Sequence, residues 1–139
     1  MKRLAHWLKV IWAAPCSAVG LLLGLGVFAL GGSARRVDGT LEFAYRQSLA
    51  QCGRHTSLFP YRAITFGHVI VAVTEAELVR YREHERVHVR QYARWGPFFP
   101  VAYVATAVWQ LFNGRRAYWD NYFEVQARKD SAEAKRTGV

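Results

Sequence analysis

The sequence predicts an α+β fold, in which an N-terminal transmembrane helix precedes a short antiparallel β-sheet packed on one long helix and two further helices. The first sign is an uncharged, apolar run from Val10 to Ala34, long enough for a membrane helix. The second is a pair of short segments, 41–46 and 64–73, with the composition of β-strands. The third is residues 78–95, in which apolar and charged side chains recur with helical periodicity.

The apolar run is the basis for the expected membrane anchor. About 20 apolar residues span a bilayer core of ~30 Å, and the run from 10 to 34 exceeds that length. Within it, Gly20 and Gly24 have the four-residue spacing of a helix-packing face. The alternative is a cleaved signal peptide, although the run is long for a signal. We therefore expect a single-pass membrane protein, with residues 1–34 as the anchor and residues 35–139 as a second domain.

The net charge of +9 among 139 residues comes mostly from arginine. Strongly basic chains commonly bind nucleic acid or anionic lipid. No nucleic-acid-binding motif accompanies the charge, so we expect a lipid membrane as partner and no nucleic acid. Cys16 lies within the apolar run and Cys52 beyond it, so no disulfide is expected. Cys52 and His55 have metal-like spacing, but a single pair of this kind is more typical of a plain loop.

Residues 41–46 and 64–73 are expected to form the sheet. In the first segment apolar and polar side chains alternate, which is typical of a strand with one solvated face. The second segment is a β-branched apolar run interrupted by Gly67 and His68. We expect it to pair antiparallel with the first, with Gly67 permitting the close approach of another backbone. For His68, a structural role and a position in a cleft both remain open.

Three helices are expected after the strands. The sequence Thr-Glu-Ala-Glu at residues 74–77 is a capping box that begins the first helix, and Gly96 with Pro97 ends it. Residues 98–112 are apolar but extend only about 22 Å as a helix, which is short of a bilayer. This segment is therefore expected to be buried or to lie along a membrane surface. The last helix is expected to begin near residues 120–121 and to fray toward the C-terminus.

The first of these helices carries the sequence His-Glu-x-x-His, formed by His84, Glu85 and His88. Positions i and i+4 lie one turn apart on the same face of a helix, so both imidazoles can bind one metal ion. Glu85 is rotated by about 100° and can act on a metal-bound water as a general base. Helical periodicity places all three side chains among the aromatic residues of this helix.

A stripe of arginines occupies the opposite side of the same helix. Its members are Arg82, Arg86, Arg90 and Arg94. Like charges four positions apart repel one another on a helix. We therefore expect either anionic lipid or the acidic side chains of another element to lie against this arginine stripe.

A catalytic zinc ion needs three protein ligands and an open position for water, so a third ligand is expected after the second histidine. The acidic candidates are Asp120, Glu124, Asp130 and Glu133. Glu124 stands out because it lies early in the last helix among aromatic residues. Asn121 with Glu124 three positions later is also a capping-box pattern. Both roles for Glu124, metal ligand and helix cap, remain open.

The combined pattern resembles the gluzincin branch of the H-E-x-x-H zinc peptidases, in which a glutamate on a later helix completes the metal site. It is also similar to that of small bacterial membrane proteins of this type. The pattern consists of His84-Glu85-x-x-His88-x-x-Gln91 followed by Asn121-x-x-Glu124-x-x-Ala127. One position departs from it: gluzincins often place an acidic residue shortly after the ligand glutamate, whereas this chain has Arg128 four positions on.

The resemblance implies a zincin-like domain with a defined set of site residues. His84, His88 and Glu124 bind zinc in such a domain, and Glu85 activates the water. The resemblance also implies that the strand at 64–73 lines the substrate cleft and pairs with an extended peptide.

These expectations describe a membrane-anchored zinc metallopeptidase of the bacterial inner membrane, acting on peptide or protein substrates. Zinc lowers the pKa of its bound water toward ~7, and Glu85 takes the proton. The group that stabilises the oxyanion stays open among five residues: Tyr81, Tyr92, Tyr118, Tyr122 and His68. One alternative is a non-catalytic protein in which zinc links two helices and the basic face binds lipid or a partner. The other is a membrane protein without a metal.

Overall fold

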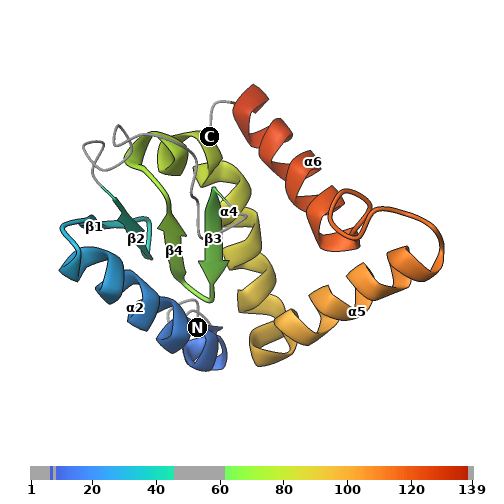
Figure 1. Ribbon diagram of the computed structural model, residues 1–139, viewed down its shortest axis with the longest axis horizontal. Coiled ribbons are helices and arrows are strands. Elements are labelled where there is room, and N and C mark those ends of the chain that lie inside the picture. Colours follow the sequence, from blue (N-terminus) through green and yellow to red (C-terminus); the bar gives the residue numbers. More distant parts are fainter. Residues whose placement is uncertain (1–6, 8, 46–61, 138–139) are drawn as a thin grey trace.

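The computed structural model describes residue 7, residues 9–45 and residues 62–137. It has an α+β architecture, with a sheet between two helices and two further helices at one side (Figure 1). The elements in chain order are α2 (Ala14–Ala29), β1 (Ser33–Val37), β2 (Thr40–Ala44), β3 (Ala63–Phe66), β4 (Val69–Ala72), α4 (Glu75–Trp95), the 3-10 helix η1 (Gly96–Phe98), α5 (Phe99–Phe112) and α6 (Tyr122–Thr137).

The sheet is mixed, with the strand order β1-β2-β4-β3. The segment expected as one strand at 64–73 is a hairpin, because the backbone turns at Gly67, whose φ is +60°. The reversal leaves β4 parallel to β2, so the expected antiparallel pairing of the two predicted segments is wrong. The sequence prediction also missed β1, which pairs antiparallel with β2. Among the described strands β3 forms one edge of the sheet, beside α4.

The prediction of a membrane-spanning helix is wrong, since no helix in the described part of the chain is both long and apolar enough to cross a bilayer. The uncharged run divides into a helix and a strand. Its backbone turns at Gly31, whose φ is +87°, and enters β1 at Ser33. The helix α2 has 16 residues, which corresponds to about 24 Å against a bilayer core of about 30 Å.

The helix α2 packs against one face of the sheet through its glycines. A Cβ at Gly20 would lie 2.8 Å from Cβ atoms of Phe66 and Val69, and one at Gly24 would lie 2.2 Å from the ring of Phe43. The glycine spacing therefore does mark a packing face, but its partner is the sheet. The expected close approach of another backbone at Gly67 is confirmed, since a Cβ there would lie 2.7 Å from the backbone nitrogen of Ser17 in α2.

The helix α4 covers the other face of the sheet (Figure 1). Its start is fixed as expected, because Thr74 Oγ1 accepts a hydrogen bond of 3.1 Å from the backbone N–H of Glu77. Its end is also as expected, since Gly96 follows the last residue with a φ of +58°. Leu78 and Val87 are almost fully buried on the side of the helix that faces the protein.

Two members of the arginine stripe are paired with carboxylates of the protein. Arg82 makes two hydrogen bonds of 2.8 Å to Glu42 of β2, whose side chain is fully buried. Arg86 forms ion pairs with Glu83 and with Asp38 in the turn between β1 and β2. Acidic side chains of other elements therefore lie against this half of the stripe, which is one of the two expected arrangements.

After α4, the chain folds back so that α6 packs along α4 and encloses an aromatic core. Tyr92, Phe99 and Phe123 meet edge to face, with ring centroids 4.4 and 5.0 Å apart. The helix α6 begins where expected and is helical through Thr137, so the expected fraying is not seen over these residues. Asn121 is fully buried and caps α6, because its Oδ1 accepts the N–H of Phe123 at 3.0 Å.

Candidate metal centre

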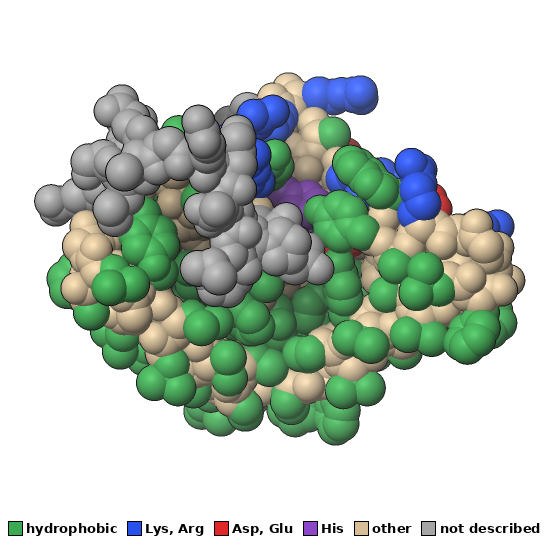
Figure 2. All heavy atoms as spheres, viewed as in Figure 1, with side chains coloured by type: hydrophobic (Ala, Val, Ile, Leu, Met, Phe, Trp, Pro, Cys, Tyr) green, Lys and Arg blue, Asp and Glu red, His purple; other side chains and the backbone are tan. Residues whose placement is uncertain are grey.

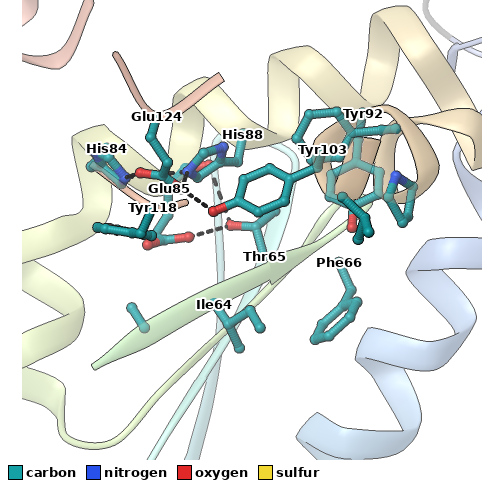
Figure 3. Close-up of a pocket in the computed structure, with 14 residues that line it drawn as sticks. Ile64, Thr65, Phe66, His84, Glu85, His88, Tyr92, Tyr103, Tyr118 and Glu124 are labelled. Carbon is teal, nitrogen blue, oxygen red and sulfur yellow. Dashed lines mark hydrogen bonds and ion pairs between the residues drawn. The ribbon is translucent and has the colours of Figure 1, made fainter. Parts of the chain in front are cut away.

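Two elements far apart in the sequence bring the expected metal ligands together. His84 and His88 lie one turn apart on α4, and Glu124 lies in the first turn of α6. The donor atoms of the three side chains all lie within 4.8 Å of one another. The close-up in Figure 3 shows the two imidazoles and the carboxylate of Glu124 pointing toward one another.

The distances within this triad are nearly equal. The Nε2 atoms of His84 and His88 are 3.2 Å apart. The carboxylate of Glu124 places Oε2 3.2 Å from His84 Nε2 and Oε1 3.3 Å from His88 Nε2. Ligand atoms bound at 2.0–2.2 Å in a tetrahedron lie roughly 3.3–3.6 Å apart. The two imidazole nitrogens lie at about this spacing from each other, and each lies at about this spacing from one oxygen of the Glu124 carboxylate. Two histidines and a carboxylate arranged in this way suit a zinc ion with a fourth position left for water.

A hydrogen bond to Gln91 orients the ring of His88. Nδ1 of His88 lies 2.8 Å from Oε1 of Gln91. The amide nitrogen of Gln91 donates to the carbonyl oxygen of Phe123 at 3.1 Å and to Oε1 of Gln126 at 3.0 Å, so its oxygen faces the imidazole as an acceptor. The proton of His88 is therefore held on Nδ1, and the lone pair of Nε2 points into the triad.

The carboxylate of Glu124 is buried, with 3% of the residue exposed. Tyr103 of α5 donates a hydrogen bond of 2.9 Å to its Oε1, and its Oε2 lies 3.2 Å from Nε2 of His84. Burial raises the pKa of this carboxyl, but the neighbouring His84 and His88 outweigh burial and lower the pKa below its ordinary value. Glu124 is therefore ionised next to the two imidazoles, as a metal ligand must be.

The position of Glu124 separates the two roles that the sequence left open. The helix cap is supplied by Asn121, while the side chain of Glu124 faces the histidines. The other acidic candidates lie elsewhere: Asp120 accepts a hydrogen bond from the backbone of Arg116. Asp130 and Glu133 lie farther along α6 and are not part of the triad. Cys52 and His55 lie outside the described residues.

Arg128 lies one turn after Glu124 on α6. Its guanidinium Nη1 lies 3.9 Å from Oε2 of Glu124. Its guanidinium carbon lies over the ring of Trp119, 5.3 Å from the centroid. A positive group therefore borders the triad on the side of α6.

Glu85 is buried beside the triad, with 5% of the residue exposed. Thr65 of β3 donates a hydrogen bond of 2.7 Å to its Oε2, which fixes the carboxylate against the sheet (Figure 3). Burial raises the pKa of Glu85, and the neighbouring histidines and the hydrogen bond from Thr65 oppose that rise. A carboxylate with a raised pKa is well suited to accept a proton from water at neutral pH.

Two cavities meet at the candidate metal centre, and both are lined by His84, Glu85 and Tyr118. The first, of about 200 Å³, runs between β3 and α5. The second, of about 400 Å³, is bordered by Arg62, Tyr81, Trp119 and Arg128. A substrate lying across the centre would therefore touch β3 on one side and a basic, aromatic wall on the other.

The structure narrows the candidates for oxyanion stabilisation. Tyr118 lines both cavities and Tyr92 lines the first. Burial, together with the charge of Glu124 and a hydrogen bond to it, raises the pKa of Tyr118, so its hydroxyl stays protonated and is a hydrogen-bond donor. Tyr81 lines only the second cavity. His68 lies in the turn between β3 and β4, where its backbone N–H donates to Ser17 Oγ at 3.0 Å, and Tyr122 is 61% exposed.

Three contacts around the centre were not predicted from the sequence. Thr65 and Tyr103 belong to elements whose position beside α4 depends on the tertiary fold. Gln91 is different, because it follows His88 by three positions on one helix face. Its role as a partner of the imidazole was therefore within reach of the sequence.

No protein-family model matches this chain, and comparisons with curated proteins and with solved structures found no match either.

Proposed function

We propose that the protein is a zinc-dependent peptidase, in which His84, His88 and Glu124 hold the metal and Glu85 is the general base. The observation that carries the proposal is that the imidazole Nε2 atoms lie 3.2 Å apart, each with one oxygen of the Glu124 carboxylate at 3.2 or 3.3 Å. A buried glutamate lies in the same cavities as these ligands. This is the arrangement that metal-assisted hydrolysis requires.

Each side chain has a distinct task in the proposed reaction. Bound zinc would supply Lewis acidity and lower the pKa of a water held in the fourth position. Glu85 accepts a proton from the attacking water and delivers it to the leaving nitrogen as the amide C–N bond breaks. Thr65 keeps the Glu85 carboxylate in place through its hydrogen bond. Tyr118 donates a hydrogen bond to the carbonyl oxygen of the substrate.

An extended peptide is the substrate that best suits the first cavity. Ile64, Thr65 and Phe66 of β3 line its wall, and no described strand pairs with the outer edge of β3. An extended chain laid along that edge gains backbone hydrogen bonds and brings one of its carbonyl groups toward the triad. The proposal therefore includes a peptide bound as an added strand.

A second candidate function is a zinc protein without turnover. The triad joins α4 to α6, so a bound ion would link two helices and stabilise the fold. Glu85 is not a metal ligand under either function. It is essential for hydrolysis under the peptidase function and has no catalytic task under the structural function.

The Glu85→Gln variant tests the choice. Under the peptidase proposal it binds zinc like the wild type, while hydrolysis of a library of quenched fluorescent peptides falls by roughly 100- to 10,000-fold. Zinc content and hydrolysis are measured on the same samples, with Glu133→Gln on the far part of α6 as the matched control. If the wild type binds one zinc ion and cleaves no peptide in the library, the structural function is supported instead.

A further inference from the structure

The helices α2 and α5 expose an unusual amount of apolar side chain. In and next to α2 the exposed residues include Ile11, Leu22, Leu25, Phe28 and Leu30. In η1 and α5 they are Phe98, Val101, Val104, Val108, Trp109, Leu111 and Phe112. Phe112 is 85% exposed and Leu22 is 72% exposed. Large apolar surfaces of this kind mark sites of contact with a partner or a membrane.

These side chains belong to one continuous surface, called the apolar face below. The ring of Trp12, just before α2, lies 6.0 Å from the ring of Phe98 in η1, so the two apolar segments meet there. Figure 2 shows hydrophobic side chains extending across the lower part of the molecule, over the positions that α2 and α5 have in Figure 1. Residues 10–34 and 95–114 contain no charged side chain.

Basic residues stand at both ends of each apolar segment. The exposed cations are Lys9, Arg35 and Arg36 around the first segment and Arg94, Arg115 and Arg116 around the second. Arg35 and Arg116 reach Glu75 and Asp120 at 3.5 and 3.6 Å. Such exposed ion pairs are weak. The rim of the apolar face therefore remains basic, which matches the overall charge of +9.

We propose that the apolar face inserts into the surface of an anionic lipid bilayer, with α2 and α5 lying in the membrane plane. Apolar side chains between cationic ends, with the exposed Trp109 among them, are the features of helices that lie in this interface. The cations then meet anionic headgroups, which attract them. A second copy of this chain docked on the apolar face would instead bring two basic rims together, and their like charges would repel.

This docking does not depend on the proposed peptidase function. It uses the outer sides of α2 and α5, whereas the metal ligands lie on α4 and α6. His84→Ala, which removes a ligand, is therefore expected to bind membranes like the wild type. Failure of the peptidase proposal and failure of the membrane proposal can thus be told apart.

The test is flotation of the full chain with vesicles of phosphatidylcholine alone or mixed with phosphatidylglycerol. We expect binding to the mixed vesicles, weakened by salt. Two double variants, Leu22→Glu with Leu25→Glu and Trp109→Glu with Phe112→Glu, should each lose at least about tenfold in partitioning, because two large apolar side chains no longer insert.

The matched control is Val79→Glu, which changes an exposed apolar residue of α4. Val79 lies 17 positions before Gly96 at the start of η1, about 25 Å along the helix. This variant should bind like the wild type. Circular dichroism checks the fold of every variant, and quenching of wild-type tryptophan fluorescence by brominated lipid checks insertion without any substitution.

Three results would overturn the proposal. The first is a wild type that does not float with the mixed vesicles, and the second is a pair of double variants that both bind as well as the wild type. The third is the absence of vesicle binding together with a lipid-free dimer, seen by light scattering, that the double variants dissociate. That last result would identify a second copy as the occupant of the apolar face.

Discussion

The helices α2 and α4 cover opposite faces of one sheet, yet they bury opposite kinds of residue. The buried residues of α2 are Gly20, Gly24 and Val27. Those of α4 are Leu78, Glu85, Val87, His88, Gln91 and Tyr92. The helix without a charged residue thus has most of its apolar side chains exposed, while the helix rich in charges has polar groups in the interior.

The difference shows where each surface needs a partner. Buried polar groups are costly unless they are paired, and those of α4 have partners in β2, β3 and α6. Exposed apolar groups are costly unless they are covered, and α2 packs on the sheet through Gly20, Gly24 and Val27 while most of its other apolar side chains stay exposed among the described residues. The interior of α4 therefore supports the proposed metal centre, and the exterior of α2 supports the proposed membrane contact.

The largest effect is expected from the ligand on α6. Glu124→Gln should lower zinc affinity by more than about 100-fold, beyond the roughly 10- to 100-fold cost of losing a hydrogen-bond partner of a ligand. Asp120→Asn is the matched control, because its carboxylate faces the backbone of Arg116. Isothermal titration with zinc measures both variants.

A loss of zinc affinity confined to Asp120→Asn would contradict the assignment of Glu124 as a ligand and would place the metal at Asp120. Retention of full affinity in His84→Ala and in His88→Ala would do the same for the α4 ligands. The zinc site would then no longer distinguish α4 from α2.

The next effect concerns the buried ion pair between α4 and the sheet. Glu42→Gln leaves the guanidinium of Arg82 without its carboxylate, and we expect unfolding free energy to fall by about 3 kcal/mol. Asp38→Asn changes an ion pair whose Asp38 side chain is 77% exposed, so its effect should stay below about 1 kcal/mol. Asparagine also tolerates the φ of +48° at residue 38. Urea denaturation measures both, and equal losses would contradict the difference in burial.

Local patterns carried most of what the sequence could predict. Thr74 and Gly96 fixed both ends of α4, and the four-residue spacing of His84 and His88 placed their imidazoles together, because these features depend only on neighbours along one helix. The parallel pairing of β2 with β4 was missed because it depends on the turn at Gly67 and on contacts distant in sequence.

The membrane helix was predicted wrongly for a different reason. An uncharged run has the same hydropathy whether it spans a bilayer or lies on a sheet with one side exposed. Hydropathy is averaged over all sides of a helix and therefore does not show which side is covered. The glycines that pack on Phe43 and Phe66 are the feature that separates these cases, but their sheet partners lie beyond the run. Tyr103 and Thr65 could not be assigned to the centre for the same reason, since α5 and β3 reach it only in the folded chain.

A smaller effect is expected at Gln91. Gln91→Leu removes the acceptor for the Nδ1 proton of His88, so the ring can rotate and zinc affinity should fall by roughly 10- to 100-fold. Gln126→Leu removes a neighbour that contacts the Gln91 amide and not the imidazole, and its zinc affinity should stay close to that of the wild type. If both variants lose affinity equally, the effect comes from the packing of α4 on α6 and not from the orientation of His88.

The smallest effects are expected within α2, where two glycines give a matched pair. Gly24→Ala places a Cβ 2.2 Å from the ring of Phe43, so the helix or the ring must move, and stability should fall by about 1–3 kcal/mol. Gly26→Ala meets no atom within 4 Å, and alanine is the better helix former by about 0.8–1.0 kcal/mol, so stability should rise slightly. Thermal unfolding of both variants measures the difference. Equal destabilisation would show that α2 does not pack on the sheet through Gly24, and the contrast between the covered and exposed sides of α2 would lose its basis.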